Sequence, residues 1–168
     1  AAKAMGAAKV IAVDWDNRFR MDLAEQLGAD LVLGKDHDVV AEILAATDGR
    51  GVDNACEFSG AQAALANAIR STRMGGFVNV LSVYGTSMPE VPMNEVVFRY
   101  LHLKGINGRK MWGTWDRMHA LLEAGAIDVE RIVTHTLPVA EFKQGMDLAG
   151  RGDCGKVVLM FDEDSAKP

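Results

Sequence analysis

The sequence predicts an α/β fold built on a doubly wound parallel sheet, and three observations predict it. Short apolar runs rich in β-branched residues alternate with segments whose apolar residues recur at helical spacing. Such strand–helix–strand units give parallel strands joined by right-handed crossovers. The first apolar run, Lys9–Val13, ends at a carboxylate, Asp14, and a helical pattern follows it. We expect this strand to be buried on both faces, as strands of parallel sheets are.

The elements of the first half follow from this periodicity and from glycine positions. Residues 1–6 are typical of a helix end, with Gly6 just past it. Phe19, Leu23 and Leu27 share one face of a helix over 17–27, which Gly28 ends. The sequence then predicts a strand at 31–33, a helix at 39–46, a turn at 48–51, a strand at 52–58, a helix at 62–71, a glycine turn at 75–76 and a strand at 77–82.

The second half is less regular. It begins with a loop over 84–94 that contains two prolines and a glycine. After this loop the sequence predicts a short helical segment at 96–100, a strand at 101–106, an amphipathic helix at 109–124, an extended segment at 131–137, a helix at 138–149 that begins at Pro138, a strand at 157–161 and a polar tail at 162–168. The helix at 109–124 has Met111, Trp115, Met118, Leu121 and Leu122 on its apolar side, and Gly125 ends it.

Composition limits the possible functions. The chain has 168 residues, 49% hydrophobic and 24% charged, with a formal net charge of −5. This length suffices for one domain with a core and part of a second. The acidic balance argues against a nucleic-acid surface, and no apolar run approaches the ~20 residues of a membrane span. Cys56 and Cys154 have neither metal nor redox spacing, so we expect reduced thiols and a cytoplasmic protein.

Asp14 is the first candidate site residue. In a doubly wound sheet, an acid that ends the second strand can accept hydrogen bonds from a ribose 2′-hydroxyl of a dinucleotide. Its charge would repel a 2′-phosphate, so Asp14 favours NAD over NADP. The alternative is that Asp14 serves only as a helix N-cap or turn residue. The residues alone leave both interpretations open.

A complete dinucleotide site also has a Gly-x-Gly-x-x-Gly turn between its first strand and first helix. Three glycine pairs lack that spacing between a strand and a helix; the pairs are Gly49/Gly51, Gly75/Gly76 and Gly105/Gly108. If residues 9–14 are the second strand, we expect the first strand and the phosphate loop to lie upstream. The strands at 9–13 and 52–58 would then either pair directly, be bridged by another chain, or belong to a longer protein.

Several motifs occur in a particular order: Val10–Asp14 with Arg20, Asp48–Asp53, Glu57–Gly60, Met74–Val78 and Gly155–Leu159. On these motifs, residues 1–161 resemble the C-terminal half of the medium-chain zinc-dependent alcohol dehydrogenases, which implies a Rossmann-like domain. The segment 104–115 and Ile132–His135 are most similar to the L-threonine 3-dehydrogenase branch. The chain departs from that branch by an extra residue between Asp14 and Arg20 and by Leu–Ser–Val–Tyr at 81–84.

The resemblance implies that eight residues bind NAD. Asp14 would hold the adenosine ribose, and Arg20 would lie along the adenine. The nicotinamide would lie over Leu81, Ser82 and Val83, whose backbone groups would bind its carboxamide, with Ile106 and Asn107 approaching from the next strand. Lys156 would face the pyrophosphate, a role that suits a mobile point charge, although a solvated lysine is an equal alternative.

The resemblance also implies a catalytic zinc, whose Cys, His and acidic ligands come from an N-terminal domain. No matching cluster occurs in this sequence, so we expect no metal ligand and no catalytic residue here. We interpret His102, His119 and His135 as structural, and His37 as a cap or a solvent-facing residue. We expect Cys56 to be a small core residue and Cys154 to be accessible. Met111, Trp112, Trp115 and Met118 have the spacing of a core or a subunit contact.

The sequence therefore predicts an incomplete dinucleotide-binding domain at 1–126 and a C-terminal segment of a catalytic domain at 127–168. The parent enzyme would be an NAD-dependent, zinc-dependent oxidoreductase of a secondary alcohol, L-threonine first and a polyol second. It would be a homo-oligomer, and this chain alone would be inactive. One alternative is a non-catalytic remnant that folds and self-associates without cofactor. Another is a methyltransferase, which also has an acid after its second strand.

Overall fold

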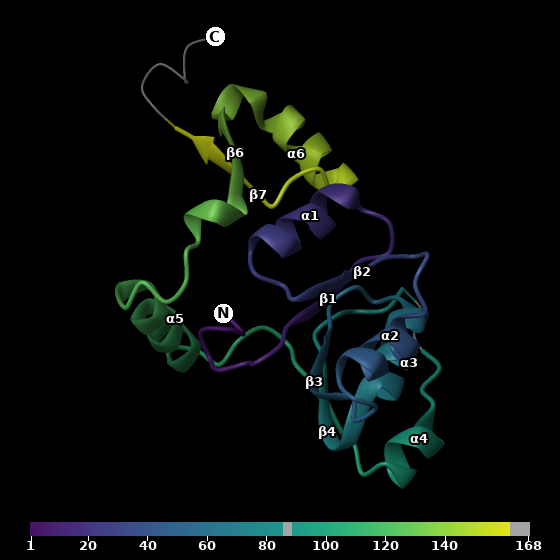
Figure 1. Cartoon of the computed structure of the whole chain (residues 1–168). Helices are drawn as coiled ribbons and strands as arrows, with labels where there is room; N and C mark the ends of the chain where they lie inside the picture. The colour runs from purple at the N-terminus through teal and green to yellow at the C-terminus, as the bar shows by residue number, and fades with distance from the viewer. Residues whose placement is uncertain (86–88, 162–168) are drawn as a thin grey trace. The chain divides into compact units, whose positions relative to one another are not determined.

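A computed structural model describes residues 1–85 and 89–161 (Figure 1). The predicted tail at 162–168 and part of the predicted loop at 84–94 lie outside the described residues. The strands are β1 (Ile11–Val13), β2 (Leu31–Leu33), β3 (Val52–Glu57), β4 (Thr72–Val80), β5 (His102–Gly105), β6 (Val133–Pro138) and β7 (Lys156–Met160). The helices are α1 (Arg18–Gln26), α2 (Val39–Ala46), α3 (Gln62–Ser71), α4 (Met93–Phe98), α5 (Gly113–Glu123) and α6 (Phe142–Arg151), with short 3-10 helices η1 (Glu130–Ile132) and η2 (Val139–Glu141).

The chain forms two compact units, and every strand pair within them is parallel. The first unit comprises residues 1–36 and 111–168, and the second comprises residues 37–110. The first unit contains a β1–β2 pair and a β6–β7 pair, and the second contains the sheet β3–β4–β5. The predicted parallel α/β class is confirmed.

The second unit is built on a small apolar core. Leu65 and Ile69, one helical turn apart on α3, contact Val78 of β4 and Leu101, and all four side chains are buried. The Arg99 guanidinium donates hydrogen bonds to the carbonyl oxygens of Ile69 and Arg70 at 3.1 and 3.0 Å. These carbonyls at the end of α3 lack helical partners, so Arg99 stabilises the helix terminus above the core.

Two glycines give β4 its irregular start. The sequence predicted a turn at Gly75–Gly76, but β4 already begins at Thr72 and continues through both residues. Gly75 has a φ of +68°, and the register of β4 against β3 shifts between Val52 and Asn54. The glycines therefore form a bulge within the strand, because a left-handed residue can interrupt a ladder without ending it.

In the first unit, α1 follows β1 and begins at Arg18, with Asn17 as its N-cap. The Asn17 side chain accepts a hydrogen bond from the backbone N–H of Arg20, and Gly28 follows the helix with a φ of +94°. Helix α6 lies along β6 and β7 (Figure 1). A Cβ at Gly145 would come within 3.1 Å of Val157 Cγ1, so the missing side chain permits this close approach.

The strand orders in two of the three sheets match parts of the doubly wound order 3-2-1-4-5-6. The pair β2–β1 has the order of its third and second strands, and β3–β4–β5 has the order of its fourth to sixth. Within its own unit, β1 pairs with β2 and β3 pairs with β4. The three alternatives given above for the strands at 9–13 and 52–58 stay predictions.

Several local predictions are also wrong. Helix α5 begins at Gly113 rather than 109, because Trp112 adopts a φ of +62°, which no helix accommodates. Strand β1 is not buried on both faces, since Val13 is 51% exposed. Cys56 is exposed rather than a core residue. Within residues 1–85 and 89–161, no helix is both long and apolar enough to cross a bilayer.

Candidate functional site

Asp14 lies directly after β1, where its backbone N–H donates to Leu33 O at 3.0 Å. Its carboxylate accepts from the Asn17 backbone N–H at 3.0 Å and from two nitrogens of Arg20, Nε at 2.7 Å and Nη2 at 3.1 Å. The Arg20 hydrogen bond lowers the pKa of this carboxyl, although partial burial opposes the shift. Asp14 is thus an ionised turn residue at the carboxyl end of its strand, while Asn17 is the helix cap. The ribose contact stays a prediction.

The C-terminal end of α6 lies against Asn17 and Arg20. The Asn17 side-chain amide donates to the carbonyl oxygens of Arg151 and Gly152 at 3.3 and 3.2 Å. Gly152 has a φ of +74°, and a side chain there would collide with the Arg20 guanidinium. Lys156, at the start of β7 in the same unit, is exposed, and its contact with a pyrophosphate stays a prediction.

A second carboxylate, which the sequence analysis quoted only within a motif, ends β3. Glu57 is 3% exposed, and one of its oxygens accepts from the Ser59 N–H, the Ser59 hydroxyl and the Gly60 N–H at 2.7, 2.6 and 3.0 Å. The other oxygen accepts from the hydroxyls of Ser82 and Tyr84, the latter at 2.8 Å. We call these five residues the Glu57 cluster.

The electrostatics of the Glu57 cluster follow from these donors. Burial raises the pKa of the Glu57 carboxyl, but the hydroxyl and amide donors outweigh burial and hold the pKa below its usual range. Burial and the neighbouring carboxylate raise the pKa of Tyr84. The cluster therefore contains an ionised Glu57 and a protonated Tyr84 at neutral pH.

The predicted nicotinamide residues lie beside this cluster. Residues 81–84 leave the sheet after β4, and the Leu81 N–H donates to Glu57 O at 2.9 Å. Ser82 points inward to Glu57, whereas Val83 is 93% exposed. Ile106 is half-buried just beyond β5, and its N–H donates to Val80 O at 2.9 Å. Asn107 follows and is exposed.

The eight predicted residues are divided between the two units. Asp14, Arg20 and Lys156 belong to the first unit, and the other five belong to the second unit. Glu57 and Tyr84 were not predicted as site residues from the sequence. The signal that could have identified Glu57 is the one that identified Asp14, namely an acid that ends a β-strand ahead of a helix.

The histidines and cysteines form no metal site among the described residues, where no group of three His, Cys, Asp or Glu side chains could hold an ion. His102 stacks on Phe77 with ring centroids 4.5 Å apart, and His119 lies 3.7 Å from Glu123. His135 Nδ1 is 3.0 Å from the Thr134 hydroxyl. A catalytic zinc therefore does not fit the residues described here.

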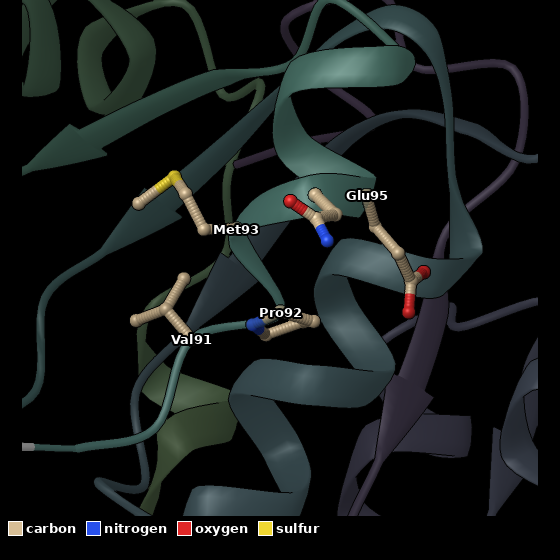
Figure 2. Close-up of a pocket in the computed structure, with 5 residues that line it drawn as sticks. Val91, Pro92, Met93 and Glu95 are labelled. Atoms are coloured by element: carbon tan, nitrogen blue, oxygen red, sulfur yellow. The ribbon is translucent and has the colours of Figure 1, made fainter.

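A pocket opens where the chain enters α4. Figure 2 shows Val91, Pro92, Met93 and Glu95 around it, and Asn94 completes the lining. Glu95 is paired with Arg70 at 3.0 Å. None of the predicted NAD-binding residues lines this pocket, so it is separate from the candidate site.

Parallel strands that end in carboxylates and backbone turns define a doubly wound α/β protein of the nucleotide-binding class. A sequence model of the zinc-binding dehydrogenase family matches residues 1–124. The chain belongs to this family. That membership excludes the methyltransferase alternative and confirms the resemblance found in the sequence.

Known relatives agree with this membership. The chain is similar to the L-threonine 3-dehydrogenases of Bacillus licheniformis, at 42% identity over 165 residues, and Pyrococcus furiosus, at 37% over 162 residues. Each match covers 95% of this chain and 46% of the relative, so the chain spans about half the length of these relatives.

Solved structures share the fold. The 2R,3R-butanediol dehydrogenase of Bacillus subtilis matches with a TM-score of 0.86 and 29% identity, over 96% of this chain and 46% of that one. An alcohol dehydrogenase of Thermus sp. ATN1 matches with a TM-score of 0.85 and 29% identity, over 95% of this chain and 45% of that one. These matches confirm the similarity to a C-terminal half.

Proposed function

We propose that this chain carries the NAD-binding half of a zinc-dependent dehydrogenase that oxidises a secondary alcohol, with L-threonine as first substrate and a polyol as second. The observation that carries the proposal is Asp14, an ionised acid at the carboxyl end of a parallel strand. We further propose that residues 1–126 form the dinucleotide-binding part and residues 127–168 a segment of the catalytic domain.

The roles of the chain's own residues in this function are binding and orientation. The Asp14 carboxylate accepts the ribose hydroxyls, Arg20 fixes that carboxylate and lies along the adenine, and Lys156 attracts the pyrophosphate. Leu81, Ser82 and Val83, with Ile106 and Asn107, hold the nicotinamide so that one face is open to hydride transfer. No zinc ligand is assigned to this chain, and no step of the reaction is assigned to the metal.

Calorimetric titration of the chain with NAD tests this proposal. Saturable binding of NAD, weaker binding of NADP and no binding of S-adenosylmethionine are the expected results. The Asp14→Asn variant should bind NAD more weakly and should discriminate less against NADP, because it lacks the negative charge that repels a 2′-phosphate. A native chain that binds none of these nucleotides would contradict the proposal.

The second candidate is a cytoplasmic, non-catalytic remnant that self-associates. Two exposed features favour this candidate. One is formed by Trp112, which precedes α5, with Trp115 and Met118 on α5, and the other is strand β5. Sedimentation velocity distinguishes the candidates when it is combined with the NAD titration. A stable oligomer without NAD binding supports the remnant, whereas an oligomer that binds NAD is the result expected for a homo-oligomeric dehydrogenase.

A further inference from the structure

The Glu57 cluster is unusual in how it satisfies a buried charge. A carboxylate removed from water is costly unless its oxygens accept several hydrogen bonds. All five groups that donate to Glu57 are neutral hydroxyls or backbone amides, and the cation-paired carboxylate Asp53 on the same strand is exposed. A buried anion that is solvated only by neutral dipoles fixes every one of those dipoles toward itself.

These dipoles come from two different loops. Ser59 and Gly60 belong to the turn between β3 and α3, whereas Ser82 and Tyr84 belong to the segment that follows β4. The loops also touch directly, because a Cβ at Gly60 would lie only 2.8 Å from Val83 O. Glu57 is thus the common anchor of both loops at the carboxyl ends of adjacent parallel strands.

The anchoring decides which side chains of residues 81–84 face outward. Ser82 and Tyr84 are half-buried and bonded to Glu57, while the alternating residues Leu81 and Val83 are exposed. Val83 is almost fully accessible although it is apolar, and an exposed apolar side chain of this kind can pack against the face of a flat ring. The backbone groups of the same segment are held in place by the inward pair.

From this geometry we infer that Glu57 is a positioning residue for the nicotinamide end of the dinucleotide. Through the hydroxyls of Ser82 and Tyr84 it fixes residues 81–84 in the conformation that presents Leu81, Val83 and their backbone to the ring. Glu57 itself does not touch the cofactor. This inference rests on the proposed function, namely that the chain binds NAD.

The test compares three nucleotides on the full chain. ADP-ribose has the adenosine and pyrophosphate parts of NAD but no nicotinamide, so the ratio of its Kd to that of NAD measures the nicotinamide contribution. NADH, whose ring is uncharged, separates positioning from direct attraction between Glu57 and the cationic ring. The variants are Glu57→Gln, which removes the charge at constant size, and Tyr84→Phe, which removes one donor from the loop side.

We expect Glu57→Gln to weaken NAD and NADH binding by about tenfold, the effect of losing hydrogen bonds to a charged group, and to leave ADP-ribose binding within about twofold of native. Tyr84→Phe should give a smaller loss of the same kind. Amide NMR shifts should change at residues 59–60 and 81–84. Asp53→Asn, at an exposed carboxylate of the same strand, is the matched control and should alter none of the three affinities.

The other outcomes are equally definite. If the ratio of the ADP-ribose Kd to the NAD Kd is the same in Glu57→Gln as in the native chain, the inference is overturned while the proposed function stands. The same holds if Glu57→Gln weakens the binding of NAD but not that of NADH. An equal loss for ADP-ribose would show a general structural role and would also overturn it. If the native chain binds neither NAD nor ADP-ribose, the proposed function fails and the inference fails with it.

Discussion

Replacing Gly60 by alanine should destabilise the second unit more than the same change at Gly49. Both glycines have left-handed backbones, with φ of +72° and +77°, so each alanine would cost about 1–2 kcal/mol in backbone strain. A Cβ at Gly49 meets nothing within 4 Å, whereas a Cβ at Gly60 would lie 2.8 Å from Val83 O. Relieving that overlap displaces backbone and adds about 1–3 kcal/mol.

The assay must report the second unit alone. The three tryptophans lie in the first unit, so their fluorescence does not suffice. Hydrogen exchange of the slowest amides of β4, near the fully buried Val78, gives the free energy of unfolding of this unit. Equal losses in Gly49→Ala and Gly60→Ala would refute the reasoning, because the contact of Gly60 with Val83 would then have no energetic effect.

Three further predictions concern the core and the two carboxylates. Ile69→Ala should lower the free energy of unfolding of the second unit by about 2–5 kcal/mol in the same exchange assay, because Ile69 is fully buried. Asp14→Asn should lower the free energy of unfolding of the first unit by less than about 1 kcal/mol, since the paired Arg20 is half exposed. Urea denaturation, monitored by tryptophan fluorescence, measures this change. The pKa of Glu57 is lowered on folding, so its stabilisation is present above its ordinary value of 4.5 and is lost as pH falls through the folded pKa. Glu57→Gln should flatten the acid limb of the stability curve of the second unit, and an unchanged slope there would contradict this assignment.

Elements with strong local signals were predicted from the sequence. The bounds of α2, α3 and β2 agree with the prediction, because a polar cap, a helical apolar face or a short apolar run marks each one. Helix α2 is an example, since Asp38 accepts from the Ala41 N–H at 3.0 Å. Such signals are local, so one sequence contains them completely.

Other features depend on contacts that the sequence does not contain. A glycine pair such as Gly75–Gly76 is equally compatible with a turn and with a bulge, and only the pairing of β4 with β3 decides. Cys56 was predicted to be a core residue on an apolar strand, yet alternation along β3 buries Glu57 and exposes Cys56. The Glu57 cluster joins residues 57–60 to residues 82–84, and no spacing rule connects them.

The two carboxylates that end β1 and β3 should respond differently to dissolved ions. Asp14 pairs with a half-exposed guanidinium, and dissolved salt weakens such ion pairs at the protein surface. Glu57 is surrounded by neutral dipoles away from solvent, where mobile ions do not enter. Ionic strength is therefore an experimental variable that weakens the Asp14–Arg20 pair and spares the Glu57 cluster, without any change to the sequence.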